Sequence, residues 1–312
     1  MKRLIVTVGY IDRPVFAYDC PVDRHQIESM LAARGDDIVM THWDDLDANL
    51  ATTLGRDVRR DVWRPVALTD ADALMILEAP APGSPFADFD RADAAMRRIL
   101  ALGIPCVNSP RTFPEYPDKR YLVERTDLPF PRSVLVEPAD DLSGALARFG
   151  DTLIVKPLIG AGGDGVARVP NDPAAVRAAL CRTGPSILQE FLPEIAAGEK
   201  SLYFLAKRFR YALLKRPRVG EFRSNEEFAE HSRYEPTPAE LGLAADAVER
   251  FGSPSLIERV DLCGDRIIEM TIECPGLKIS ACGVHREIGP WTYEALDHAI
   301  DIAHAAGPTA TP

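Results

Sequence analysis

Apolar runs and helical periods alternate along the first 110 residues of the chain. They predict strands at 3–9, 37–41, 73–77 and 105–107, and helices at 24–34 and 86–102. This alternation is typical of a parallel α/β layer, which binds ligands at the edge where its strands end. Five polar side chains follow these strands and are either solvated loop residues or ligands of a small molecule: Tyr10, Asp12, Arg13, Glu78 and Asn108.

A different pattern follows the Pro-rich break at 110–117. It predicts strands at 131–136, 153–157, 166–170 and 186–192, with helices at 141–149 and 172–182. Further along, it predicts paired strands at 201–206 and 210–215, a polar loop at 216–233, a helix at 237–250, and strands at 256–262 and 265–272. We expect an N-terminal α/β domain at 1–112, two α+β subdomains at 113–185 and 186–306, and a tail at 307–312.

Composition excludes several classes of protein. The chain has 312 residues and a formal net charge of −11, which argues against a general surface for binding nucleic acid or other polyanions. No apolar run approaches the roughly 20 residues that span a bilayer, and the first strand is too short for a signal peptide. The six cysteines lack metal-ligand spacing, and we expect reduced thiols in a cytoplasmic protein without a membrane partner.

The most informative motif is the apolar run 153–157, which contains Lys156 and leads into a glycine-rich loop. Backbone N–H groups of such a loop can close on a phosphate, and its glycines are Gly160, Gly162, Gly163 and Gly165. The spacing also satisfies the dinucleotide fingerprint, but that fold needs a helix after the third glycine. Here the alternating segment 166–170 predicts a strand, so the motif is a phosphate lid or a surface hairpin.

Cations for a nucleotide triphosphate must come from a few places in this acidic chain, and the candidates are Lys119, Lys156, Lys215, Arg216 and Arg223. The alternative is that each of these is simply a solvated basic residue. This explanation is weakest for Lys156, because its apolar neighbours would make an unpaired ammonium costly.

The segment at 189–193 ends a strand and then breaks at proline. Backbone groups of Gln189 and Glu190 can meet an adenine edge while Phe191 and Leu192 pack on its face. Glu199, ten residues after Gln189, could accept hydrogen bonds from a ribose. Each of these residues is nonspecific alone, but together with Lys156 they indicate one nucleotide site.

Two carboxylates, Asp261 and Glu269, lie eight residues apart in a predicted hairpin. This spacing can place them opposite each other across the ladder, where a shared Mg²⁺ would relieve their repulsion. The alternative is a salt bridge from one of them to Arg259 or Arg266. Glu273 is an additional candidate ligand.

The polar loop after Lys215 contains Arg223 and Asn225. A solvent loop would explain this composition, but not easily an arginine and an asparagine two positions apart just before a charged run. We expect Arg223 to stabilise charge on a reacting oxygen and Asn225 to orient substrate or metal, which with Lys215 gives three candidate catalytic residues.

Taken in order, these blocks resemble the ATP-grasp superfamily, specifically its glutathione-synthetase-like branch. The resemblance covers roughly residues 110 to 280, through Asp118-Lys119, Val155-Lys156-Pro157 with its glycine loop, 189–193, Gly198-Glu199, Lys215-x-Pro217, Gly220-Glu221-x-Arg223-x-Asn225, and Val260-Asp261 through Glu269 to Pro275. No single block is specific, but the ordered set is.

This resemblance implies an ATP-grasp fold that holds ATP between two α+β halves, with Lys119 and Lys156 on phosphates or adenine. It implies Glu199 on the ribose and Mg²⁺ on Asp261 and Glu269, with Mn²⁺ as an alternative ion. It also implies a ligase that forms an acyl phosphate and ADP before an amine displaces phosphate. Thr271 stands where the family commonly has asparagine or glutamate as the third metal ligand.

The segments 201–204 and 215–217 also resemble, less specifically, the group of ATP-grasp enzymes that includes the cyclo-ligase forming D-cycloserine from O-ureido-D-serine. This narrower resemblance implies a role in antibiotic biosynthesis. We expect an amino-acid-like substrate between the Arg223 loop and the N-terminal edge, where Tyr18 and Asp19 join the candidates. A small-molecule kinase and a non-catalytic nucleotide-binding module are alternatives, and a homo-oligomer stays open.

Overall fold

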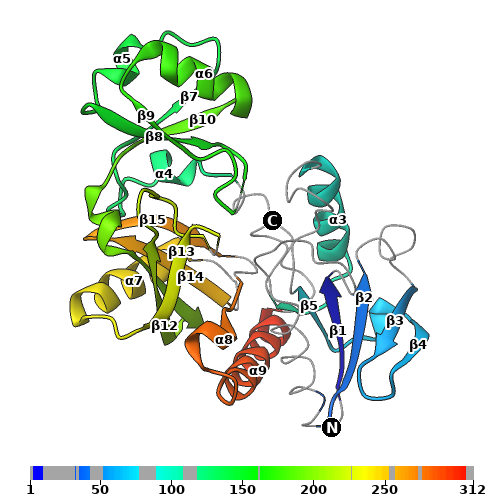
Figure 1. Cartoon of the computed structure of the whole chain (residues 1–312). Helices are drawn as coiled ribbons and strands as arrows, with labels where there is room; N and C mark the ends of the chain where they lie inside the picture. The colour runs from blue at the N-terminus through cyan, green and yellow to red at the C-terminus, as the bar shows by residue number, and fades with distance from the viewer. Residues whose placement is uncertain are drawn as a thin grey trace.

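The structure, a computed structural model, describes residues 3–9, 32, 35–42, 52–76, 89–107, 118–160, 162–225, 227–252, 257–272 and 276–306. Three β-sheets form the framework shown in Figure 1. The N-terminal sheet has the order β4-β3-β2-β1-β5-β6. Its strands are β1 (Leu4–Gly9), β2 (Asp37–His42), β3 (Thr53–Asp57), β4 (Val62–Val66), β5 (Ala73–Ile76) and β6 (Cys106–Val107).

The predicted parallel layer is confirmed for β1, β2, β5 and β6. The sequence pattern did not predict the antiparallel β3–β4 hairpin, which extends this sheet at its edge. Much of β4 is exposed, so its residues lack the strict apolar alternation that marks a half-buried strand. The short helix η1 (Leu68–Asp70) follows the hairpin, and α3 (Phe89–Ala101) precedes β6.

The central sheet has the order β7-β10-β8-β9, and each neighbouring pair is antiparallel. Its strands are β7 (Ser133–Val136), β8 (Thr152–Pro157), β9 (Ala167–Pro170) and β10 (Ser186–Glu190), with α4 (Tyr121–Glu124), α5 (Ser143–Leu146) and α6 (Pro173–Thr183) in the same region. Figure 1 shows α5 and α6 together on the outer side of this sheet. They cover a separate apolar core that includes Leu153, Val155, Val176 and Leu188.

Two features of the central sheet bear on the sequence predictions. Strand β9 directly follows the glycine loop and pairs with β8, so the predicted strand-loop-strand hairpin is confirmed. The dinucleotide alternative, which needs a helix there, does not apply. Strand β10 pairs with both β7 and β8, although the predicted boundary at residue 185 assigned it to the next subdomain.

The C-terminal sheet has the order β13-β12-β11-β14-β15, again antiparallel throughout. Its strands are β11 (Glu199–Leu205), β12 (Arg208–Pro217), β13 (Ala229–Tyr234), β14 (Ile257–Cys263) and β15 (Arg266–Thr271), with η3 (Pro193–Ala197) before β11. One face buries Leu202, Phe204 and Val260 against α7 (Pro238–Phe251). The β-strand alternation then places residues 199, 201 and 203 on the opposite face.

Capping side chains explain where two helices begin. Asp172 accepts a hydrogen bond from the Ala175 N–H at the start of α6. Thr237 and Glu240 form a capping box at the start of α7, and each helix has proline in its first turn. These caps lie in the sequence itself, which explains why both helices were predicted to within one residue at each end.

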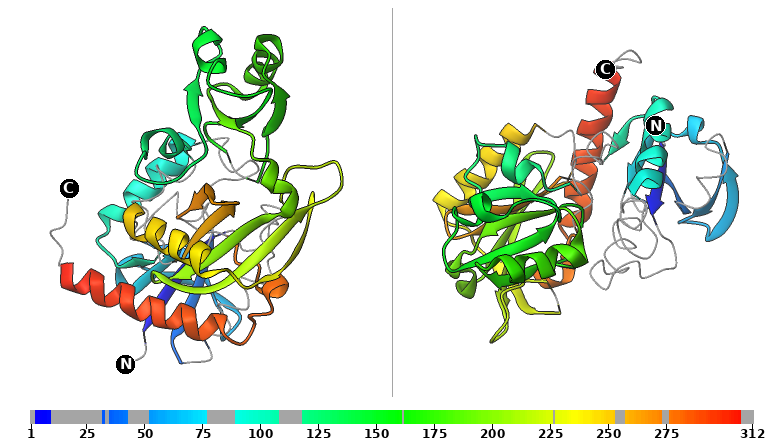
Figure 2. Two further views of the ribbon diagram at one scale, coloured as in Figure 1. Left: turned by 90° about the vertical axis from the view of Figure 1, so that its left-hand side faces the viewer. Right: turned by 90° about the horizontal axis from the view of Figure 1, so that it is seen from above.

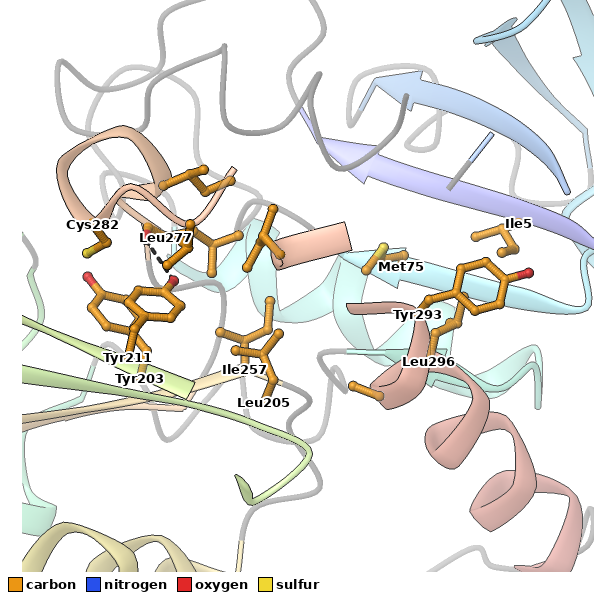
Figure 3. Close-up of a cluster of buried hydrophobic side chains, with 14 of the residues drawn as sticks. Ile5, Met75, Tyr203, Leu205, Tyr211, Ile257, Leu277, Cys282, Tyr293 and Leu296 are labelled. Carbon is orange, nitrogen blue, oxygen red and sulfur yellow. Dashed lines mark hydrogen bonds between the residues drawn. The ribbon is translucent and has the colours of Figure 1, made fainter. Parts of the chain in front are cut away.

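A shared apolar core joins the C-terminal sheet to the N-terminal sheet through α8 (Ile279–Cys282) and α9 (Ile288–Ala306). Figure 3 shows Tyr203 and Tyr211 at one end of this core and Ile5, Met75 and Tyr293 at the other. The two tyrosine rings stack with centroids 4.6 Å apart, and their hydroxyls donate to the carbonyls of Gly276 and Leu277.

The right-hand view of Figure 2 places α9 between the N-terminal sheet and the C-terminal subdomain. Within the described residues, the central sheet has its own core and contributes no residue to the core shared by the other two sheets. No helix in the described part of the chain is long and apolar enough to cross a membrane.

Candidate functional site

The inner face of the C-terminal sheet carries a row of charged residues at its end nearest the central sheet. Glu199 lies opposite Lys215 across β11 and β12. Ser201 lies opposite Asp261 across β11 and β14, and Asp261 lies opposite Glu269 across β14 and β15. Directly paired residues point to the same face of a sheet, so all five side chains share one surface. The predicted facing of Asp261 and Glu269 is thus confirmed.

Asp261 is buried and held by cations. Arg259 donates from Nε to both Asp261 oxygens at 2.9 Å and from Nη2 at 2.6 Å, while Ser201 Oγ donates to Oδ1. Lys215 Nζ lies 3.7 Å from the same oxygen. Burial opposes ionisation of Asp261, but these partners outweigh it, so the pKa of this carboxyl lies below its usual value. The salt-bridge alternative raised for one carboxylate therefore holds for Asp261.

Glu199 is equally enclosed, with 8% of its surface exposed. Lys215 Nζ binds its Oε1 at 2.6 Å, and Ser224 Oγ donates to its Oε2. A carboxylate has about four lone-pair positions, so each oxygen can still accept one further bond. The ribose contact expected for Glu199 would add to these bonds or replace the one from Ser224.

Glu269 and Thr271 are the oxygen donors of this face with room for a ligand. Among the described residues, Glu269 forms no hydrogen bond or ion pair, and the buried Thr271 hydroxyl has no hydrogen-bond partner. Mg²⁺ in nucleotide sites is typically held by one or two carboxylates together with phosphate oxygens. Glu269 and Thr271 fit such an ion, whereas Asp261 would have to share its oxygens with Arg259.

The facing surface belongs to the central sheet. Lys156 lies opposite Ile187, and Gln189 lies opposite Ile154, so these four side chains share the face that turns away from α6. Lys156 Nζ donates to the Ile268 carbonyl of β15 at 3.3 Å and thereby bridges the two sheets. Burial lowers the pKa of Lys156 from its usual value, and the nearby Glu269 carboxylate is the main opposing influence.

Lys119 is the second lysine in this space. Its Nζ donates to the carbonyl of Gly160, and its backbone N–H donates to the Leu158 carbonyl at 2.9 Å. Burial lowers the pKa of Lys119, again opposed mainly by Glu269. Both predicted phosphate lysines therefore meet at the base of the glycine loop with Glu269 as their common counter-charge.

The glycine loop uses backbone conformations that disfavour other residues. Gly162, Gly163 and Gly165 have φ of +67°, +76° and +69°. A Cβ at Gly165 would lie 2.7 Å from Pro157 Cγ and 3.1 Å from Thr183 Cγ2, so the loop is packed against the end of β8. This close approach packs the loop against the ends of β8 and α6.

The predicted adenine hinge ends β10 at the opposite end of this sheet from the glycine loop, because Glu190 pairs with Leu153 at the start of β8. Gln189 is buried and donates to Ser133 Oγ at 3.0 Å, and Glu190 pairs with Arg132 on the surface. Arg168 lies over the Phe191 ring at 4.1 Å, so one ring face is occupied by a guanidinium. Leu192 precedes the short helix η3.

The predicted catalytic loop lies between β12 and β13. Arg223 donates to Glu221 at 2.8 Å and stacks on Phe228 at 3.6 Å, so its guanidinium is held by its own loop. Asn225 instead reaches the glycine loop, where a Cβ on Gly163 would overlap its side-chain amide. The expected charge-stabilising role of Arg223 requires it to leave Glu221.

Several predicted residues lie outside the described part of the chain, namely Tyr10, Asp12, Arg13, Tyr18, Asp19, Glu78, Asn108 and Glu273. Three residues of the charged face were not predicted as site residues: Ser201, Ser224 and Arg259. Arg259 precedes Asp261 by two positions, so strand alternation could have placed it on the same face. The serines carry no such signal.

Comparison with known proteins agrees with this geometry. Residues 121–281, just over half of the chain, match the family model of the prokaryotic glutathione synthetase ATP-grasp domain. Glutathione synthetase of Brucella melitensis is 29% identical over 238 residues, which is 72% of this chain and 70% of that protein. The Agrobacterium fabrum enzyme is 28% identical over 180 residues, and the match spans 54% of each chain, about half of that relative's length.

Solved structures share the fold over nearly the whole chain. D-cycloserine synthetase DcsG has a TM-score of 0.66 and 18% identity, covering 97% of this chain and 99% of its own. D-alanine–D-alanine ligase of Bacillus anthracis in complex with ATP has a TM-score of 0.67 and 14% identity, covering 98% and 99%. The fold is therefore ATP-grasp, and the chain belongs to the prokaryotic glutathione synthetase ATP-grasp domain family.

Proposed function

We propose that this chain is an ATP- and Mg²⁺-dependent ligase that activates a small amino-acid-like carboxylate as an acyl phosphate and couples it to an amine. The coupling joins two molecules or closes a ring within one. The observation that carries the proposal is the meeting of two polar faces in an ATP-grasp fold: Lys156 of the central sheet reaches β15 beside Glu269, opposite the row that contains Lys215 and Asp261.

The lysines are the phosphate-binding groups in this proposal. Lys119 is buried and Lys156 half-buried at the base of the glycine loop, and both have Glu269 as their main opposite charge. An anionic triphosphate would replace that carboxylate as their partner, since ammonium groups without a counter-charge are costly to bury. The glycine loop then covers the phosphates with backbone N–H groups and excludes water from the acyl phosphate.

Once a triphosphate replaces Glu269 as the partner of the two lysines, the Glu269 carboxylate is available to bind a divalent cation. Glu269 with the Thr271 hydroxyl and, in part, Asp261 would hold Mg²⁺, and the ion would neutralise charge on the phosphates. Arg259 keeps Asp261 ionised and in place. Phosphoryl transfer needs this kind of positioning and charge neutralisation more than covalent help from the protein.

The test is an ATP-dependent phosphate-release screen of the purified chain against amino acids and small peptides with Mg²⁺. Active mixtures are repeated with hydroxylamine, which converts an acyl phosphate to a hydroxamate. A ligase releases ADP and phosphate and yields a hydroxamate. ADP with a stable phosphorylated product and no free phosphate would instead identify a kinase, and ATP binding without turnover of any acceptor would favour a nucleotide-binding module.

A further inference from the structure

Ser224 occupies an unusual position in the loop between β12 and β13. Its neighbours Arg223 and Asn225 are half-buried, whereas Ser224 is only 7% exposed. Ser224 is therefore the residue of this trio that is most enclosed by the protein. A small polar residue turned into the protein at this point needs a hydrogen-bond partner.

Ser224 is anchored twice to the C-terminal sheet. Its hydroxyl donates to Glu199 Oε2, and its carbonyl oxygen lies 3.0 Å from Nε2 of His231. His231 lies directly opposite Lys215 in the β12–β13 register, and Lys215 binds the other Glu199 oxygen at 2.6 Å. Both anchors of Ser224 therefore belong to one buried group, in which Lys215 already immobilises Glu199.

The next residue carries this restraint to the glycine loop. Asn225 packs so closely on Gly163 that a Cβ on that glycine would overlap the amide oxygen of Asn225. Gly163 itself has a φ of +76°, within a loop that also packs against Pro157 and Thr183 at Gly165. The Asn225 side chain thus limits how far the tip of the glycine loop can move toward the β12–β13 loop. The position of Asn225 depends in turn on how firmly Ser224 is held.

We propose that Ser224 is a positioning residue: by binding Glu199 it fixes Asn225 against Gly163 and so sets the place at which the glycine loop rests. The hydroxyl acts through Asn225 and does not itself contact phosphate. The part of this inference that concerns nucleotide affinity rests on the proposed function, whereas the part that concerns the loop without nucleotide does not.

The test compares Ser224→Ala with Ser224→Thr, which keeps the hydroxyl, and with Ser232→Ala, an exposed serine of β13. Without nucleotide, an Asp-specific protease cleaves before the exposed Asp164 of the glycine loop, and mass spectrometry follows the fragment. We expect about tenfold faster cleavage in Ser224→Ala, as for loss of one hydrogen bond to a charged group, and near-wild-type rates in the other two. Equal rates in Ser224→Ala and Ser232→Ala would overturn the proposal.

A second measurement uses a non-hydrolysable ATP analogue with Mg²⁺, and AMP. Ser224→Ala should weaken the analogue about tenfold and AMP less than about twofold, because AMP lacks the phosphates that the loop covers. Equal weakening of both would overturn the positioning role. If the wild type binds neither nucleotide but cleavage before Asp164 is still faster in Ser224→Ala, the proposed function fails and the role of Ser224 stands. If thermal unfolding shows that Ser224→Ala has lost its fold, Asn225→Ala replaces it with the same expected outcomes.

Discussion

Glu258 provides a quantitative test of the structure. This β14 residue is completely buried, and Lys207 Nζ binds its Oε1 while its Oε2 has no hydrogen-bond partner among the described residues. Burial disfavours the charged form more than Lys207 favours it, so the pKa of Glu258 rises from 4.5 to about 7. The perturbation is Glu258→Gln, which keeps the shape and removes the titration.

The direction of the effect follows from proton binding. Between pH 4.5 and about 7 the native state holds a proton on Glu258 that the unfolded state has released. The free energy of unfolding therefore falls as the pH rises through this window and is constant with respect to this group above and below it. The change from 4.5 to about 7 corresponds to about 3 kcal/mol at about 1.36 kcal/mol per pH unit.

The assay is urea unfolding of the wild type and of Glu258→Gln at several pH values from 4.5 to 8. The difference in unfolding free energy between the two proteins should change by about 3 kcal/mol across the window, with the variant gaining relative stability at high pH. Glu235→Gln, at a side chain that is 86% exposed, serves as the control and should give a profile parallel to the wild type. Parallel profiles for Glu258→Gln would refute the reasoning.

The remaining predictions concern the site. Glu269→Ala removes the expected metal ligand and Asp261→Ala removes the partner of Arg259, so each should lower kcat about 100-fold or more. ATP turnover that persists in these variants at saturating Mg²⁺ would show that the metal assignment is wrong. Arg223→Ala should lower kcat about 100-fold with little change in KM for ATP, and the reverse pattern would exclude a role in the transition state. Gly165→Ala should raise KM for ATP and lower the thermal midpoint, since an added Cβ meets Pro157 at 2.7 Å and φ is +69°; a midpoint equal to that of the wild type would contradict this packing.

Local patterns predicted the central and C-terminal elements well. The buried strand β8 contains an apolar run at 153–155, and α6 and α7 have their capping residues in the sequence. Strand β13 was interpreted as part of a polar loop because half of its side chains are exposed and only Ala229 is buried. Its pairing with β12 makes it a strand, and that pairing is a long-range property.

The candidate site divides in a similar way. The motif residues on the two facing surfaces were all candidates from the sequence, and hairpin spacing alone placed Asp261 opposite Glu269. The hydrogen-bond partners of these residues could not be predicted from sequence spacing. The bond from Ser224 to Glu199 crosses 25 positions, and the one from Ser201 to Asp261 crosses 60. Such contacts depend on strand register and on a loop that folds back, neither of which has a local signature.

Residue type and short-range spacing are enough to predict the fold family, the order of the nucleotide blocks and the strand-loop-strand form of the glycine loop. The pairing of charges appears only in the folded chain, where Glu269 is near both lysines, Asp261 is bound by Arg259, and Glu199 accepts bonds from Lys215 and Ser224. The physical reason is that electrostatic and hydrogen-bond partners are set by distance and burial across separate sheets, and these quantities exist only once the chain has folded.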